Sequence, residues 1–135
     1  MEGWGILGTW AADCSAPPGR DNTFYTYVRR GDRVFLDRDG QGFKDSSPIT
    51  RAEVLPDGMI EYRVDFGRGP KKDRSNVFIN TFAKGPEGRI RIFFNRSEAG
   101  EVTVREGRLL PGGVETSWRE RCRPGRIVSS GNAAD

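Results

Sequence analysis

The sequence predicts an all-β protein, an up-and-down antiparallel meander that closes into a barrel of about eight or nine strands. Three observations predict it: apolar and polar residues alternate in short runs, turn residues separate the runs, and no stretch has the periodicity of a substantial helix. The alternation is clearest where Ile60, Tyr62 and Val64 share one face and Glu61 and Arg63 share the other. That pattern is typical of a strand buried on one side only.

Several alternating runs follow one another along the chain. Their expected bounds are 4–12, 24–30, 33–37, 49–55, 59–66, 77–83, 89–94, 101–105 and 114–122. Turns rich in glycine, proline and acidic residues separate them, at 30–33, 56–58, 85–88, 97–100, 106–107 and 111–113. Such turns are typical of tight hairpins, so neighbouring runs should pair antiparallel. The longest connections, at 14–22, 39–48 and 67–75, are where loop-borne function would lie.

A meander of this length either leaves two open edges or closes on itself, and closure removes the edges. The interior of such a small barrel is filled by side chains or holds one small ligand. A two-sheet sandwich is the alternative, although its crossovers need longer connections than most in this chain. We expect a single domain over residues 1–123 and a flexible tail over residues 124–135.

The composition excludes several kinds of chemistry. No histidine occurs among the 135 residues, which removes Ser-His-Asp and Cys-His catalysis and every zinc site that needs imidazole. Two cysteines are too few for a four-sulfur metal site. The net charge of +3 is spread over a mixed surface, which predicts no nucleic-acid partner, and no apolar run is long enough to span a membrane. We expect no metal, no cofactor and no enzymatic activity, in a monomer or weak dimer.

The two cysteines flank the predicted strands: Cys14 follows the first strand and Cys122 ends the last. If closure brings the chain ends together, a disulfide between them would close a loop of about 109 residues and stabilise the fold by roughly 4 to 5 kcal/mol. The other interpretation is two unrelated free thiols. A disulfide implies an oxidising compartment, so we expect a periplasmic or secreted protein whose signal peptide has been removed.

Two segments carry a family resemblance. Residues 6–10, Ile-Leu-Gly-Thr-Trp, are similar to the Gly-x-Trp motif on the first strand of lipocalins and related calycin barrels. Residues 118–122 resemble the last strand of those proteins, where an arginine packs on that tryptophan. In this chain Gly8 would permit close backbone approach, Trp10 would plug one end, and either Arg119 or Arg121 would be the stacking arginine. The middle Thr-Asp-x-x-Tyr motif and a C-terminal helix are missing, so the resemblance implies a divergent bacterial lipocalin-like barrel.

A lipocalin-like cup implies a non-enzymatic protein that binds a small hydrophobic or amphipathic ligand. The candidate ligand-binding residues are those expected to point inward, with a tyrosine hydroxyl or an inward arginine setting the orientation. They are Trp10, Ile60, Tyr62, Val64, Ile92, Phe94 and Trp118. The other interpretation is that the same side chains fill the core. A cavity above roughly 300 Å³ would favour binding.

Two other function classes remain open. The first is a protein-interaction module, such as a periplasmic enzyme inhibitor, that acts through the loops 15–22, 39–48 and 67–75. The second is an enzyme that uses tyrosine or carboxylates. Glu61 and Asp65 lie on the polar face of one predicted strand, but they are roughly 13 Å apart along it, which is too far for a glycosidase pair.

Overall fold

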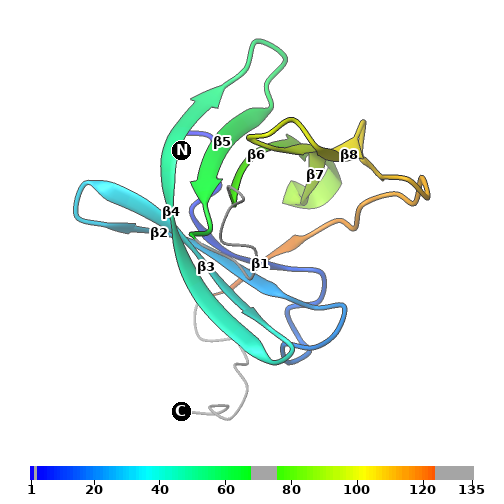
Figure 1. Cartoon of the computed structure of the whole chain (residues 1–135). Helices are drawn as coiled ribbons and strands as arrows, with labels where there is room; N and C mark the ends of the chain where they lie inside the picture. The colour runs from blue at the N-terminus through cyan, green and yellow to red at the C-terminus, as the bar shows by residue number, and fades with distance from the viewer. Residues whose placement is uncertain (2, 68–75, 124–135) are drawn as a thin grey trace.

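One antiparallel sheet contains every strand of the part of the chain that the structure describes. The computed structural model describes residues 1, 3–67 and 76–123 (Figure 1). Its elements are β1 (Gly8–Ala11), β2 (Phe24–Arg30), β3 (Arg33–Gly40), β4 (Phe43–Val54), β5 (Ile60–Asp65), β6 (Val77–Lys84), the 3-10 helix η1 (Pro86–Gly88), β7 (Ile90–Ser97), β8 (Val102–Arg105), β9 (Arg108–Leu109) and β10 (Glu120–Cys122). The strand order is β10-β1-β2-β3-β4-β5-β6-β7-β8-β9. The predicted all-β antiparallel meander is therefore confirmed.

The sheet does not close into a barrel. Its ladder ends at β9 and β10, which do not pair with each other. The chain between them passes through Pro111 and Gly112, which are poor at continuing a ladder because proline lacks an N–H group and glycine adds no packing side chain. This segment returns to the sheet at an isolated antiparallel bridge between Ile90, the first residue of β7, and Arg119. A second isolated bridge joins Glu115 of this segment to Arg108 of β9, so bridges and not a strand connect the segment to the sheet.

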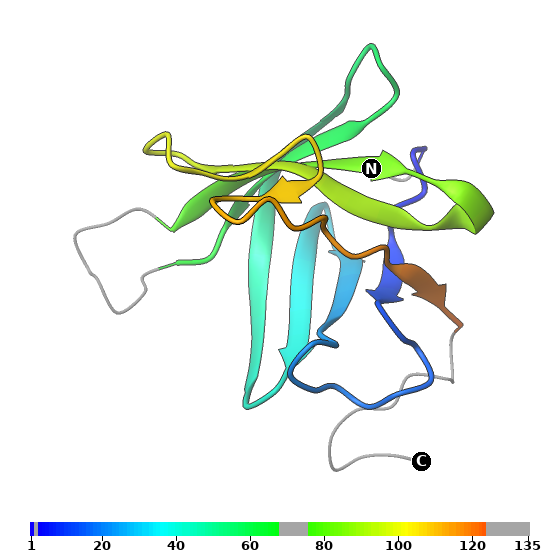
Figure 2. The same ribbon diagram turned by 90° about the vertical axis from the view of Figure 1, so that its right-hand side faces the viewer.

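The long strand β4 carries the sheet from one layer to the other. Its first half pairs with β3 up to Ile49, and its second half pairs with β5. The register shifts between Ile49 and Arg51, and a bulge at such a position bends the strand. As a result β5, β6 and β7 run across the layer that contains β1, β2 and β3 (Figure 2). The candidate site lies between these two layers.

The prediction of a long connection at 39–48 is wrong. β3 and β4 form a long hairpin there with a two-residue turn. Charged side chains face each other across this hairpin. Arg38 pairs with Asp45, with a shortest N–O distance of 2.6 Å, and Asp39 pairs with Lys44 at 3.8 Å. Opposite charges in direct register stabilise a strand pair. A polar segment whose sequence is typical of a loop therefore forms part of the ladder.

The first and last predicted strands are shorter than expected. The run 4–12 is a strand only over Gly8–Ala11, and the run 114–122 only over Glu120–Cys122. Within the described residues the helical contribution is one 3-10 turn, as the missing helical periodicity predicts. Of the connection expected at 67–75 only Gly67 is among the described residues, and the tail predicted over 124–135 lies outside them.

The core follows the predicted alternation of β5. Ile60, Tyr62 and Val64 are 0%, 2% and 0% exposed, whereas Glu61 and Arg63 are partly exposed. Full burial of a side chain such as that of Ile60 contributes about 1.5 to 3 kcal/mol. The main core cluster contains Trp4, Ile6, Trp10, Tyr27, Val34, Leu36, Ile49, Ile60, Tyr62, Val64, Phe82 and Ile90.

A disulfide joins the connection after β1 to the last strand. The sulfur atoms of Cys14 and Cys122 are 2.07 Å apart and their Cα atoms 5.3 Å apart, which confirms the predicted pairing. β1 also pairs directly with β10, with Thr9 opposite Cys122. A covalent bond and a ladder therefore hold the two ends of the described chain together.

Arg121 is the arginine that packs on Trp10. Its Cζ atom lies 4.3 Å from the centroid of the indole ring, and its guanidinium donates to the carbonyl oxygens of Leu7, at 2.7 Å, and Gly5. Gly8 has a φ of 123°, and a Cβ atom there would lie 2.6 Å from Nη1 of Arg121. Only glycine gives the backbone this conformation and leaves this space for the guanidinium.

Candidate functional site

A cavity of about 490 Å³ lies between the two layers and opens to solvent. Side chains from β2, β3, β5, β6 and β7, the residues that flank the β5–β6 connection, and the segment before β10 all contribute to it. The lining residues are Tyr25, Leu36, Arg38, Tyr62, Phe66, Asn76, Phe78, Asn80, Phe82, Ile92, Asn95 and Arg119. The volume exceeds the roughly 300 Å³ expected of a small-molecule site.

Aromatic rings form much of the cavity wall. The rings of Tyr62 and Phe82 stack with centroids 5.9 Å apart, and those of Phe66 and Phe78 are tilted against each other at 5.8 Å. Phe78, Asn80 and Phe82 alternate along β6, so all three face the same side. The wall therefore offers flat apolar surface with a polar side chain set into it.

A chain of side-chain hydrogen bonds crosses the lining. The hydroxyl groups of Tyr27 and Tyr62 are 2.5 Å apart, and Nδ2 of Asn80 donates to the Tyr62 oxygen at 3.3 Å. Nδ2 of Asn95 donates to Oδ1 of Asn80, and the hydroxyl of Thr103 donates to Oδ1 of Asn95. Because each member has a partner, this chain fixes the orientation of the polar groups that face the cavity.

The two hydrogen-bonded tyrosines are neutral at ordinary pH. Burial raises the pKa of Tyr62 above its usual value and that of Tyr27 well above it, although the nearby charge of Arg119 partly opposes the rise. Phenols that hold their protons this firmly are poor general bases. The pair therefore lends no support to the interpretation of the protein as an enzyme that uses tyrosine as a base.

Two arginines bring positive charge to the cavity. Arg38 is held by Asp45, to which its Nε donates at 3.0 Å and its Nη2 at 2.6 Å. Both arginines also lie against aromatic rings: the Cζ atom of Arg38 is 4.1 Å from the ring centroid of Phe66, and that of Arg119 is 3.8 Å from the centroid of Tyr25 and 5.0 Å from that of Phe82. Cation–π contacts of this kind stabilise the position of a guanidinium without neutralising its charge.

A second cavity, of about 260 Å³, adjoins the first. Tyr25, Ile92 and Arg119 line both, and the smaller one adds polar and charged side chains that include Arg20, Asp21, Thr116 and Ser117. Arg119 therefore lies where the two cavities meet.

The structure divides the seven predicted ligand-binding residues into three groups. Tyr62 and Ile92 line the larger cavity. Trp10, Ile60 and Val64 belong to the packed core and are not among the residues that line the cavity. For these three the alternative interpretation, that the side chains fill the core, describes what is observed.

Phe94 does not line the cavity because of a bulge in β7. Phe82 of β6 pairs with Ile92, but the adjacent Thr81 pairs with Phe94, so Phe93 is an extra residue on β7. An extra residue reverses the alternation beyond it. Ile92 and Phe94 therefore face opposite sides, although they are two residues apart.

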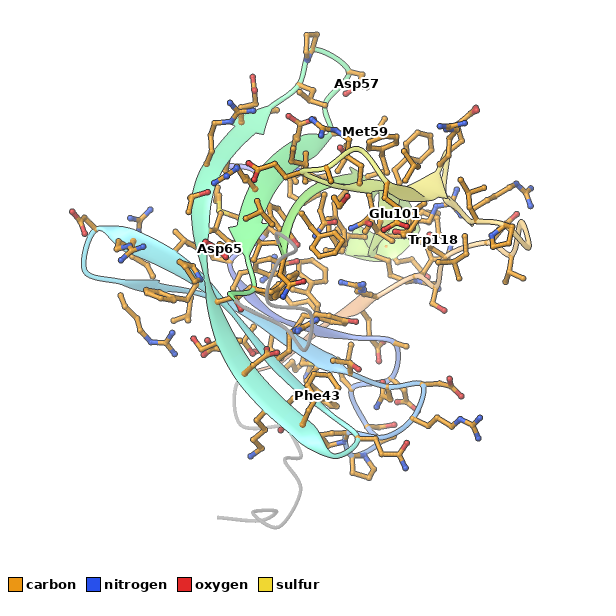
Figure 3. The ribbon with its side chains drawn as sticks, viewed as in Figure 1. Phe43, Asp57, Met59, Asp65, Glu101 and Trp118 are labelled. Carbon is orange, nitrogen blue, oxygen red and sulfur yellow. A yellow bond between two sulfur atoms is a disulfide. The ribbon has the colours of Figure 1, made fainter. Side chains whose placement is uncertain are left out.

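Trp118 does not line the cavity either. Its ring packs on Gly85, where a Cβ atom would lie 2.3 Å from the indole, and the guanidinium of Arg91 is 4.8 Å from the ring centroid. Figure 3 shows Trp118 beside β7. Its segment is joined to the sheet by isolated bridges and not by a strand, so strand alternation does not describe where its side chains point.

Most of the residues that line the cavity were not predicted from the sequence. Only some of them lie in a sequence pattern that could have identified them. Phe78, Asn80 and Phe82 alternate inside a predicted strand, so the period that identified Tyr62 also applies to them. The contact of Arg119 with Tyr25 had no such signal, because it depends on how the segment after β9 returns to β7.

Over residues 1, 3–67 and 76–123, no helix is long and apolar enough to cross a membrane, and no group of three or more His, Cys, Asp or Glu residues could hold a metal ion. No protein-family model matches the chain, and neither the curated proteins nor the solved structures include a match. The larger cavity is therefore the feature of this chain that points to a function.

Proposed function

We propose that this protein is a non-enzymatic binding protein that holds a small hydrophobic or amphipathic molecule in the larger cavity. The observation that carries the proposal is a space of about 490 Å³ with an aromatic wall and a few fixed polar groups. Ligand sites are typically clefts of roughly 300 to 1,000 Å³ with this kind of lining.

The fold and the disulfide support a related proposal about the architecture and the location of this binding protein. We propose a lipocalin-like cup in which the curved sheet surrounds the ligand although its ladder stays open. The contact of Arg121 with Trp10, with Gly8 beneath it, supports that relationship. The bond between Cys14 and Cys122 supports a periplasmic or secreted location, because disulfides persist in oxidising compartments.

A protein-interaction module is the second candidate. The observation that favours it is a group of exposed apolar side chains at and after the edge strand β9, where Leu109, Leu110 and Val114 are 45%, 41% and 65% exposed. The loops that the sequence suggests for protein interaction give this candidate less support. The segment 39–48 is a hairpin, and the loop 15–22 is held by Asn22, whose side-chain amide donates to three backbone carbonyls.

Native mass spectrometry of protein purified from its own source distinguishes the two candidates. We expect a population with one small molecule retained, which is released on unfolding. A protein that retains no small molecule but copurifies with one specific protein in fixed stoichiometry would overturn the binding proposal in favour of the interaction module.

A matched pair of variants tests whether the cavity is the binding site. Ile92→Trp places a larger ring in the cavity, whereas Phe94→Trp enlarges a ring of the same strand on its other face. The probe is N-phenyl-1-naphthylamine, a neutral apolar fluorophore. We expect wild type and Phe94→Trp to bind it and Ile92→Trp to bind at least about tenfold more weakly, with all three cooperatively folded by circular dichroism. Equal binding by the two folded variants would contradict the proposed site.

A further inference from the structure

The charge of the larger cavity has one sign. Its described lining includes two cations, Arg38 and Arg119, and no aspartate or glutamate. The other polar lining groups are the amides of asparagines and the hydroxyls of tyrosines. A ligand that enters this cavity therefore meets uncompensated positive charge unless each arginine has a counter-ion elsewhere.

Arg38 has such a counter-ion, whereas Arg119 has none among the described residues. Two hydrogen bonds tie Arg38 to the carboxylate of Asp45. The guanidinium of Arg119 makes no hydrogen bond or ion pair with any residue in the described part of the chain, and its contacts there are with aromatic rings. A guanidinium has five N–H donors and stays charged in proteins, so Arg119 keeps its full capacity to bind an anion.

The backbone holds Arg119 in this place. Its N–H donates to the carbonyl of Ile90 at 2.7 Å, and the N–H of Ile90 donates back at 3.0 Å. β10 begins at the next residue and is tied to the first connection by the disulfide at Cys122. The rings of Tyr25 and Phe82 then limit where the guanidinium lies. A site on such fixed elements loses little freedom when a ligand binds.

The nearby tyrosines do not supply the missing negative charge. Tyr27 and Tyr62 are buried, and burial raises the pKa of both phenols, so they are neutral. Their hydroxyls are paired with each other, and Asn80 donates to Tyr62. Asp21, which lines the smaller cavity together with Arg119, forms no ion pair with it either, so no described residue supplies the anion and we expect the ligand to supply it.

From the unpaired guanidinium of Arg119 beside the aromatic wall, we propose that the ligand is a carboxylate with an apolar body. The carboxylate accepts two parallel N–H bonds from Arg119, and the body lies along Tyr62, Phe78 and Phe82. This inference rests on the proposed function and adds the chemical class of the ligand. Bidentate pairs of this kind are among the strongest hydrogen bonds in proteins and favour a planar anion over a neutral or cationic head.

The test is displacement of bound N-phenyl-1-naphthylamine by four competitors. Decanoate and 2-naphthoate carry the carboxylate on a chain or on a ring, whereas decan-1-ol and decylammonium carry a neutral or positive head. We expect at least one of the two carboxylates to bind about tenfold or more tightly than decan-1-ol, and decylammonium to bind most weakly. The preferred carboxylate tells whether the natural ligand has a chain or a ring.

Three variants assign the preference to Arg119. Arg119→Gln should weaken carboxylate binding by about 10- to 100-fold and leave the fluorophore and decan-1-ol within about twofold. Arg119→Lys should restore part of the loss, because lysine keeps the charge without the two-donor fork. Arg105→Gln, which removes an exposed positive charge from β8 outside the cavity, should behave as wild type.

Each result decides the inference. If wild type binds decan-1-ol as tightly as both carboxylates, or if Arg119→Gln weakens all competitors equally, the inference fails while fluorophore binding leaves the proposed function in place. If wild type binds neither the fluorophore nor any competitor, the proposed function fails and the inference with it. The comparison within wild type holds even if the Arg119 variants do not fold.

Discussion

Arg121 stacks its guanidinium on the indole ring of Trp10, with the Cζ atom 4.3 Å from the ring centroid. Two residues earlier, Arg119 lies 3.8 Å from the ring centroid of Tyr25, and Trp10 and Tyr25 are direct partners across β1 and β2. The last segment therefore places two arginines on neighbouring aromatic rings of the first two strands. Arg121 also donates to the backbone carbonyls of Leu7 and Gly5, whereas the guanidinium of Arg119 makes no hydrogen bond within the described residues and lines the cavity.

The close approach of Arg121 to Gly8 predicts that adding one methyl group at Gly8 lowers the stability of the fold considerably. Gly8→Ala should lower the free energy of unfolding by about 2 to 3 kcal/mol, because alanine is strained at a φ of 123° and its Cβ would displace Arg121. Urea unfolding followed by tryptophan fluorescence measures the change. Gly112→Ala is the matched control, since a Cβ atom there meets nothing and its φ is not in the left-handed region, and it should stay within about 0.5 kcal/mol.

A double variant separates the two causes of this effect. In an Arg121→Ala background the displaced guanidinium is absent, so the cost of Gly8→Ala should fall to the part that comes from backbone strain. An unchanged cost would mean that the close approach of Arg121 to Gly8 contributes nothing to stability.

The strand pattern predicts a fold better than it predicts which side chains line a cavity. The alternation of β5 and the positions of Cys14 and Cys122 depend on local period and chain order, and both are readable from the sequence. The side on which Phe94 lies depends on one extra residue in β7, which leaves no mark in composition. The hairpin at 39–48 was missed for a related reason, since its ion pairs exist only once the register is known.

The candidate site depends even more on long-range geometry. Tyr62 and Ile92 were found from alternation, but Arg119 enters the cavity only because an isolated bridge to Ile90 brings its segment back to β7. An isolated bridge involves one residue on each side, so it leaves no alternation of apolar and polar residues in the sequence from which it could be predicted. Closure of the sheet was overestimated for the same reason, because the chain through Pro111 and Gly112 returns as a bridge and not as a strand.

The disulfide predicts a large loss of stability on reduction. Cys14→Ser/Cys122→Ser should lower the free energy of unfolding by about 3 to 5 kcal/mol, because the bond closes a long loop in the unfolded chain. Urea unfolding of the variant, and of wild type with and without reductant, measures the loss. Wild type under denaturing conditions should take up alkyl groups only after reduction. A loss below about 1 kcal/mol would mean that the β1–β10 ladder alone holds the ends together.

The buried pair Tyr27 and Tyr62 predicts a loss of stability at alkaline pH. Burial raises the pKa of both phenols in the folded protein, whereas in the unfolded chain they ionise near the usual value of 10.0. Above pH 10.0 the unfolded state therefore releases protons that the folded state retains. The free energy of unfolding is unaffected by the pair below that pH and falls as the pH rises toward the folded pKa values, by up to about 1.4 kcal/mol per pH unit for each tyrosine.

Phenylalanine variants assign this alkaline slope to the pair. Urea unfolding between about pH 8 and about pH 11 should give a shallower slope for Tyr27→Phe and a nearly flat one for Tyr27→Phe/Tyr62→Phe, since phenylalanine has no proton to release. Tyrosinate absorbance should show the same protons leaving only as wild type unfolds. Thiol exchange does not complicate the measurement, because both cysteines are bonded to each other. If wild type and the double variant lose stability equally above pH 10.0, the two phenols are not held in the neutral form by burial.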